Sequence, residues 1–202
     1  YENLVIDSTL VNNVTCFGLA DGLVDIYVSG GSLTNQTYEL FANEILVSSG
    51  NVSNPIIIGD LDVNNYTISI TDPDCGNVEE TFLITQPDEL IVQIDNVFSE
   101  LVCFSDTNGF IELSVDGGVP PYTYSWSSGE NTDDINNLGA GVYELTVIDS
   151  TGCESVFIQE ITEPEEFSVS YEIGNVLCYG DNNGFIDLTT SGPGLFSYSW
   201  SS

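Results

Sequence analysis

The chain of 202 residues contains no Lys, Arg, His or Met. A protein of this length ordinarily carries roughly 25 basic residues, so their complete absence is not chance. Asp and Glu together number 32, and the formal net charge is −32 at pH 7. Nucleic acid is excluded as a partner because its binding requires Lys or Arg to neutralise phosphates. An anionic membrane surface would repel the chain for the same reason.

Long hydrophobic runs and most catalytic groups are missing as well. No run approaches the ~18 consecutive apolar residues of a membrane span, so direct membrane insertion is not expected. Without His, Lys or Arg, few general bases and activated nucleophiles remain. A pair of carboxylates could hydrolyse a glycosidic bond, but no unique pair stands out in the sequence. The composition therefore predicts a protein that is not an enzyme.

The chain does contain an internal repeat. The stretch Cys103–Leu113 (CFSDTNGFIEL) returns as Cys178–Leu188 (CYGDNNGFIDL), and a more diverged copy begins at Cys16. Ile84-Thr85-Gln86-Pro87 likewise matches Ile161-Thr162-Glu163-Pro164. Self-similarity at a fixed period indicates an array of like modules. The prolines divide the chain into a divergent repeat at 1–87, a complete repeat at 88–164 and an incomplete third repeat at 165–202.

Apolar residues alternate with polar ones in each repeat. Ile111, Leu113 and Val115 are separated by Glu112 and Ser114. Turn-forming clusters of Gly, Pro, Asp and Ser stand between such runs. Many short strands separated by such turns indicate an antiparallel sandwich. We therefore predict an all-β chain of tandem immunoglobulin-like β-sandwich modules in an end-to-end array, and Cys103, Trp126 and Cys153 follow the immunoglobulin Cys–Trp–Cys order.

The five cysteines fall in matching positions of the repeats. We predict disulfides Cys16–Cys75 and Cys103–Cys153 within modules, with the partner of Cys178 beyond the segment. Paired cysteines in register favour an oxidising, extracellular setting. A pairing between modules, such as Cys75 with Cys103, is the alternative because spacing does not determine connectivity. Zinc is disfavoured, since two thiols per module and no His supply too few ligands.

Residues along the second segment match a known family. They are Cys103, Asn108-Gly109-Phe110-Ile111, Gly117-Gly118-Val119-Pro120-Pro121-Tyr122-Thr123-Tyr124-Ser125-Trp126-Ser127, Gly129, Ile135-Asn136-Asn137-Leu138, Gly141-Val142-Tyr143, Val147, Asp149-Ser150-Thr151-Gly152-Cys153 and Pro164. This pattern resembles the SprB-type repeat of very long surface adhesins of gliding bacteria. The resemblance extends to 165–202 and, more weakly, to 1–87. It implies display at the cell surface, export by type IX secretion, adhesion during gliding and no catalytic residues.

Two acidic loops are candidate calcium sites. Asp106 and Asn108 in the second repeat, and Asp181 and Asn183 in the third, surround a Gly turn with oxygen ligands. Calcium prefers such clustered oxygens. The alternative is a simple hairpin turn, because Asn-Gly favours positive φ. No downstream bidentate Glu or flanking helix completes a calcium-binding helix–loop–helix, which favours the turn.

Three aromatic residues share one face of a predicted strand. Tyr122, Tyr124 and Trp126 could stack on sugar rings of a glycan. Such a face is more often part of a sandwich core, because aromatic side chains bury large apolar areas. We favour the core.

The leading hypothesis is a structural and adhesive repeat segment of an extracellular adhesin filament, secreted through the outer membrane and serving attachment and gliding. Its expected partners are neighbouring repeats of the same chain and a surface polysaccharide or substratum. No cofactor is expected, and calcium is the one candidate. The first alternative is a calcium-dependent glycan-binding β-sandwich module. A glycosidase accessory domain is a third.

Overall fold

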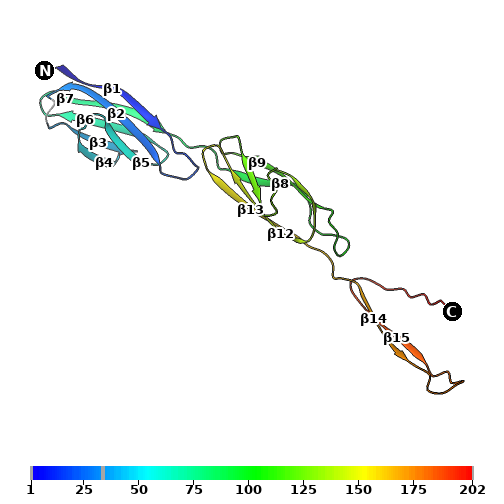
Figure 1. Cartoon of the computed structure of the whole chain (residues 1–202). Coiled ribbons are helices and arrows are strands. Elements are labelled where there is room, and N and C mark those ends of the chain that lie inside the picture. The colour runs from blue at the N-terminus through cyan, green and yellow to red at the C-terminus, as the bar shows by residue number, and fades with distance from the viewer. Residues whose placement is uncertain (1, 33–34, 202) are drawn as a thin grey trace. The chain divides into compact units, whose positions relative to one another are not determined.

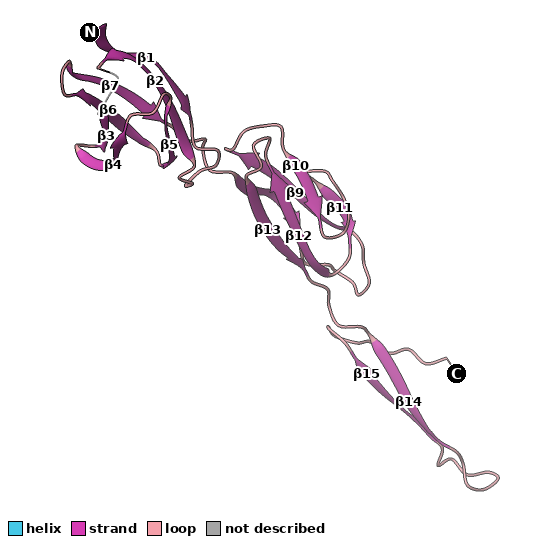
Figure 2. Ribbon diagram, turned by 60° about the vertical axis from the view of Figure 1, so that its left-hand side comes forward, coloured by secondary structure: helices cyan, strands magenta, loops and turns pink. Residues whose placement is uncertain are grey.

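The computed structural model describes residues 2–32 and 35–201. Within those residues every element of regular secondary structure is a β-strand, and Figure 2 shows no helix there. The described part of the chain accordingly has no helix that could cross a membrane. The strands are β1 (Glu2–Asn12), β2 (Gly22–Gly31), β3 (Thr37–Ala42), β4 (Ile45–Asn51), β5 (Ile56–Leu61), β6 (Asn64–Asp72), β7 (Gly76–Ile84), β8 (Ile91–Phe98), β9 (Gly109–Asp116), β10 (Thr123–Trp126), β11 (Ile135–Leu138), β12 (Gly141–Ile148), β13 (Glu154–Ile161), β14 (Ser168–Gly174) and β15 (Phe185–Ser191).

The first repeat is built from two sheets of antiparallel strands (Figure 1). One has the order β1-β2-β5 and the other the order β4-β3-β6-β7. In immunoglobulin lettering these are strands A-B-E and C′-C-F-G, the Greek-key arrangement of an immunoglobulin-like sandwich. The predicted fold class is confirmed.

The core of the first repeat follows from the alternation in its strands. On β2, Val24, Ile26 and Val28 are buried while the intervening side chains are partly exposed. Leu40 on β3 and Ile68 on β6 face them from the other sheet and are fully buried. Because strand side chains point alternately to opposite faces, the alternation of polar and apolar residues gives each sheet one buried face and one solvent-exposed face.

The second repeat repeats this plan with fewer strands. Its sheets are β11-β9-β8 and β10-β12-β13. Ile111 and Leu113 on β9, and Leu145 and Val147 on β12, are buried as the sequence pattern predicts. The described residues between β10 and β11 form no strand equivalent to β4, so the second sheet lacks a C′ strand.

Residues 165–202 contain a single hairpin. Strands β14 and β15 pair antiparallel from Ser168 opposite Ser191 to Gly174 opposite Phe185. Ile186 is 53% exposed, whereas its equivalent Ile111 is fully buried. The third repeat thus has the first strands of the sandwich without the sheet that covers them.

The chain forms two compact units whose limits differ from the predicted segments. The first unit comprises Tyr1–Ile91, Val115–Thr123 and Val147–Ser155; the second comprises Val92–Ser114, Tyr124–Thr146 and Val156–Ser202. The first unit therefore includes two parts of the second repeat, the connection between β9 and β10 and the turn between β12 and β13. Each named sheet still draws its strands from only one predicted segment.

Candidate functional site

A disulfide within the first compact unit links two sequence repeats. Cys16 of the first repeat is bonded to Cys153 of the second, with Cα atoms 5.6 Å apart. Cys75, Cys103 and Cys178 are free thiols. The predicted pairings Cys16–Cys75 and Cys103–Cys153 are therefore wrong, and the alternative Cys75–Cys103 is not formed either. The bond fits an extracellular protein, as the cysteine usage predicted.

Strand geometry explains why the first pairing within a module fails. Val14, two residues before Cys16, donates its backbone N–H to the Thr85 carbonyl at 3.0 Å, which places Cys16 at the end of β7. Cys75 directly precedes Gly76, the first residue of the same strand. Nine strand residues span ~30 Å. A disulfide needs Cα atoms within ~7 Å, so these two thiols cannot meet.

The second repeat has the same arrangement. Leu101 donates its backbone N–H to the Thr162 carbonyl at 2.8 Å, so Cys103 lies at the end of β13. Cys153 directly precedes Glu154, where β13 begins. The strand's eight residues separate the two cysteines by ~26 Å.

The leading cysteine of each repeat lies in a tight turn that we call the cysteine loop, residues 16–19, 103–106 and 178–181. In all three, the backbone N–H of the fourth residue donates to the cysteine carbonyl, at 3.2, 3.3 and 3.1 Å respectively. The third residue has positive φ each time: 76° at Gly18, 61° at Ser105 and 88° at Gly180. The three loops therefore share one backbone conformation although their sequences differ.

The cysteine loop is tied to the last residues of its own repeat. Gly18 donates its N–H to Gln86 Oε1 at 2.9 Å, and Ser105 donates its N–H to Glu163 Oε2 at 2.6 Å. Gln86 and Glu163 directly precede the boundary prolines. The loops of the first two repeats are thus held at the point where the next repeat begins.

The later cysteines lie in a second motif, the aspartate turn, residues 72–76 and 149–153. In the second repeat, Asp149 Oδ1 accepts the N–H groups of Thr151 and Cys153 at 2.8 and 3.0 Å. Its Oδ2 accepts the N–H of Val119 at 2.8 Å. Burial alone would raise the pKa of this carboxyl, but these bonds and the Thr151 hydroxyl outweigh it and lower the pKa to about 2.

Asp72 has the same role in the first repeat. Its Oδ2 accepts bonds from the Gln36 side-chain amide at 2.9 Å and the Ser32 N–H at 2.6 Å. Its Oδ1 accepts the N–H groups of Asp74 and Cys75. The bond from Gln36 and then the backbone donors hold the pKa of Asp72 well below its ordinary value, against the opposing effect of burial. Cys75 stands one residue earlier in its turn than Cys153 does.

The aspartate turn is held against the first residues of its repeat. Gly118 donates its N–H to the Asp88 carbonyl at 2.9 Å, beside the Val119–Asp149 bond. Gly117 has φ 72°, and a Cβ there would lie 1.9 Å from the Glu89 carbonyl oxygen. Only glycine allows this close approach of two backbone segments. The turn cysteine of a repeat is therefore fixed near that repeat's beginning.

Sequence reasoning missed both aspartates, since Asp149 was noted only within the family-like pattern and Asp72 was not singled out. Neither Asp72 nor Asp149 was a predicted site residue, although both are nearly fully buried, at 1% and 5% exposure. A usable signal was present, because an Asp precedes the later cysteine by three or four residues in both repeats.

The predicted calcium residues lie in or beside the cysteine loops. Asp106 Oδ2 accepts the N–H of Cys103, and Asp181 Oδ2 accepts the N–H of Cys178, both at 3.2 Å. Asn108 and Asn183 follow in the exposed connection to the next strand. Among the described residues no group of three or more Cys, Asp or Glu side chains could hold a metal ion. Calcium binding at these loops stays a prediction.

The predicted aromatic face divides between interior and surface. Trp126 is 4% exposed, donates Nε1–H to the Thr132 carbonyl at 2.9 Å and packs edge-on against Phe157. An indole buried in this way offers no face to a sugar, so the stacking role of Trp126 is wrong and the core alternative holds. Tyr122 and Tyr124 are partly buried, and the Tyr122 hydroxyl donates to the Gly117 carbonyl.

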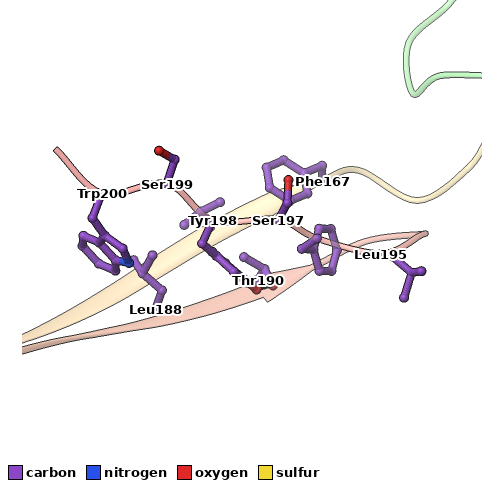
Figure 3. A pocket seen from close by; sticks show the side chains of 10 residues that line it. Phe167, Leu188, Thr190, Leu195, Ser197, Tyr198, Ser199 and Trp200 are labelled. Carbon is purple, nitrogen blue, oxygen red and sulfur yellow. Dashed lines mark hydrogen bonds between the residues drawn. The ribbon is translucent and has the colours of Figure 1, made fainter.

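A hollow of about 420 Å³ lies in the third repeat (Figure 3). Figure 3 places Leu188, Thr190 and Trp200 around it. The equivalents of Leu188 and Trp200 are Leu113 and Trp126, which are buried in the second repeat. The hollow is therefore the sandwich interior left uncovered by residues 165–202, and its shape does not indicate a ligand site.

Comparison with known families identifies the repeats. The SprB repeat matches residues 8–40, 96–131 and 170–202, together about half of the chain. The chain belongs to the SprB repeat family. The resemblance read from its residues is confirmed, including the diverged first repeat. No curated protein matches the chain.

Several solved structures resemble this chain at low sequence identity. Titin domains I67–I69, in an E-to-A mutated variant, are 12% identical with a TM-score of 0.49, over 96% of this chain and 77% of theirs. The three N-terminal domains of the outer capsid protein Hoc of bacteriophage RB49 are 18% identical with a TM-score of 0.44, over 96% and 70%. A C-terminal 282-residue fragment of intimin, in complex with the intimin-binding domain of its translocated receptor, is 11% identical with a TM-score of 0.44, over 83% and 66%. The immunoglobulin-like assignment rests on strand order rather than on these scores.

Proposed function

We propose that this chain is a structural segment of an extracellular surface adhesin and that it serves attachment and gliding motility. The observation that carries the proposal is the Cys16–Cys153 disulfide, which joins one repeat covalently to the next. A protein that repeats one sandwich and cross-links successive copies is suited to holding a binding tip away from the envelope. Catalysis plays no part in this proposal.

Charge supports the same role. With 32 acidic and no basic residues, neighbouring filaments repel one another at close range. At physiological salt this repulsion extends only ~8 Å, so it limits lateral packing without preventing attachment at a tip. Partners would be neighbouring repeats and, at the end of the filament, a polysaccharide or solid substratum.

No specific observation favours the alternative of a calcium-dependent glycan-binding module. Trp126 is inside the sandwich, and Asp106 and Asp181 already accept backbone hydrogen bonds within their loops.

Antibody labelling of the source cells tests the proposal. Fab fragments raised against the purified chain should label intact cells as strongly as permeabilised cells. They should also reduce attachment and gliding, whereas Fab fragments against a cytoplasmic protein should do neither. Labelling that requires permeabilisation would contradict a surface role. Surface labelling without any effect on attachment or movement would contradict the adhesive and gliding part.

A further inference from the structure

Cys103 is an exposed thiol in a conformation that forms a disulfide elsewhere in the same chain. Its loop matches the loop of Cys16 in the backbone bond to the cysteine carbonyl, the positive φ two residues later and the bond to the end of the repeat. Cys16 is bonded and Cys103 is not. The two loops differ in their partners rather than in their geometry.

The partner of Cys16 comes from the aspartate turn of the following repeat. That turn is positioned near the beginning of its repeat by the bonds Val119–Asp149 and Gly118–Asp88. The cysteine loop is positioned near the end of its repeat by Gln86. Since the end of one repeat and the beginning of the next are adjacent along the chain, these two local arrangements bring the thiols together.

The cysteine-loop arrangement is also present at the next boundary. Ser105 binds Glu163, directly before Pro164. Beyond it, Gly192 also has positive φ, and a Cβ there would lie 3.0 Å from the Phe167 Cα and 3.3 Å from the Glu166 carbonyl oxygen, a looser approach than the 1.9 Å at Gly117. Residues 165–202 contain a cysteine loop but no aspartate turn. The loop thiol of the second junction is therefore in place, free and exposed.

We infer that Cys103 is placed to form a disulfide with the aspartate-turn cysteine of any complete repeat joined after it, as Cys16 does with Cys153. The bond requires an oxidant of the disulfide class, such as oxidised glutathione. The Cys103 thiolate attacks one glutathione sulfur and releases one glutathione thiolate. The turn thiolate then attacks the Cys103 sulfur and releases the second, so two thiols lose two electrons and two protons to the oxidant.

Lengthening the full chain tests the inference. A copy of residues 129–164 joined after Ser202 completes the third repeat, because Tyr198–Ser202 matches Tyr124–Ser128. The lengthened chain is oxidised in a glutathione buffer, alkylated, digested with an acid-specific protease and analysed by mass spectrometry. We expect a peptide pair joining Cys103 to the appended copy of Cys153, together with the Cys16–Cys153 pair.

Matched variants separate this bond from random oxidation. Cys103→Ser should abolish the new pair and leave the appended cysteine alkylated, whereas Cys178→Ser should leave the pair intact. Recovery of Cys103 as an alkylated thiol while Cys16–Cys153 is intact would overturn the inference. A pair between Cys178 and the appended cysteine as the main product would overturn it as well.

A second chain keeps the test decisive if the completed third repeat of the first chain does not fold. In it, residues 165–202 are replaced by a second copy of residues 88–164, which supplies a repeat from one source. Circular dichroism and a cooperative melt establish folding in each chain. A free Cys103 in a folded chain of this second kind contradicts the inference whatever the first chain does. The assay reads only a covalent bond, so its outcome is independent of the attachment and gliding experiment.

Discussion

The backbone N–H of Ser105 donates a 2.6 Å hydrogen bond to the carboxylate of Glu163, fifty-eight positions later in the chain. The bond joins the cysteine loop of the second repeat to the last residue before its boundary proline. Gly18 and Gln86 form the equivalent bond in the first repeat, at 2.9 Å. The loop that carries the leading cysteine is therefore held by residues of its own repeat.

Removing the disulfide should lower stability markedly. Cys16→Ser opens a loop with a sequence separation of 137, and the chain-entropy model assigns about 5 kcal/mol to closing a loop of that length. We expect a lower urea midpoint for the first two repeats, measured through the fluorescence of the buried Trp126. Cys178→Ser changes a free, exposed thiol and is the control. Equal midpoints for the two variants would contradict a stabilising role for the bond.

Acid should weaken both repeats through their buried aspartates. The folded pKa of Asp149 is lowered to about 2, and that of Asp72 is lowered as well, whereas an unfolded Asp titrates near ~3.9. A depressed folded pKa stabilises above the unfolded pKa, and this stabilisation is lost as pH falls through the folded value. Urea midpoints should therefore fall steeply between about pH 4 and pH 2.

Substitution of one carboxylate should flatten that dependence. Asp149→Asn should lower stability at pH 7, by ~1–3 kcal/mol for weakened bonds to buried donors, and should reduce the loss on acidification. Glu165→Gln removes an equal charge at an exposed position and should leave the pH profile unchanged. An unaltered profile in Asp149→Asn would show that this carboxylate does not contribute.

Gly117→Ala should be far more damaging than another glycine substitution. Both Gly117 and Gly129 have positive φ, which costs an alanine ~1–2 kcal/mol. A Cβ on Gly117 would also lie 1.9 Å from the Glu89 carbonyl oxygen, whereas a Cβ on Gly129 meets nothing within 4 Å. We expect about 3 kcal/mol or more for Gly117→Ala in urea unfolding. Comparable losses in the two variants would contradict the close approach.

The free thiols should differ in reactivity. Cys103 and Cys178 are exposed, whereas Cys75 is partly buried. Desolvation, then the nearby Asp72 carboxylate, raises the pKa of the Cys75 thiol. Since the thiolate is the reacting species, Cys75 should be alkylated more slowly at pH 8 and should gain most from a rise in pH. Time-resolved mass spectrometry of iodoacetamide labelling measures the order, and Cys75 reacting first would contradict it.

Calcium separates the structural role from the glycan-binding alternative. We expect calcium to leave the melting temperature unchanged, because Asp106 and Asp181 bind backbone N–H groups within their own loops. The alternative predicts a gain that a chelator reverses and that Asp106→Asn diminishes. Such a gain in the parent chain would contradict our expectation.

The strands and their buried faces could be predicted from local pattern alone. Ile111 and Leu113 alternate with polar neighbours, and the side chains of a strand point alternately to opposite faces. Cysteine connectivity could not be predicted in this way. Equal register suggested Cys103–Cys153, but register along the sequence does not reveal that the two residues lie at opposite ends of β13. The burial of Asp149 also depends on Val119 and its neighbours, thirty positions away, whose contacts the local pattern does not contain.

The Cys16–Cys153 bond also determines which residues carry tension when the two ends of the chain are pulled apart. A pulling force passes from β1 through Cys16 directly to Cys153 and leaves by β13, so the intervening loop is shielded. With a sequence separation of 137, this shielded length amounts to roughly 450–490 Å of extended chain. A disulfide that bypasses the intervening residues would let a surface filament bear a force that would otherwise unfold both sandwiches. Single-molecule extension should gain that length only after a reductant is added.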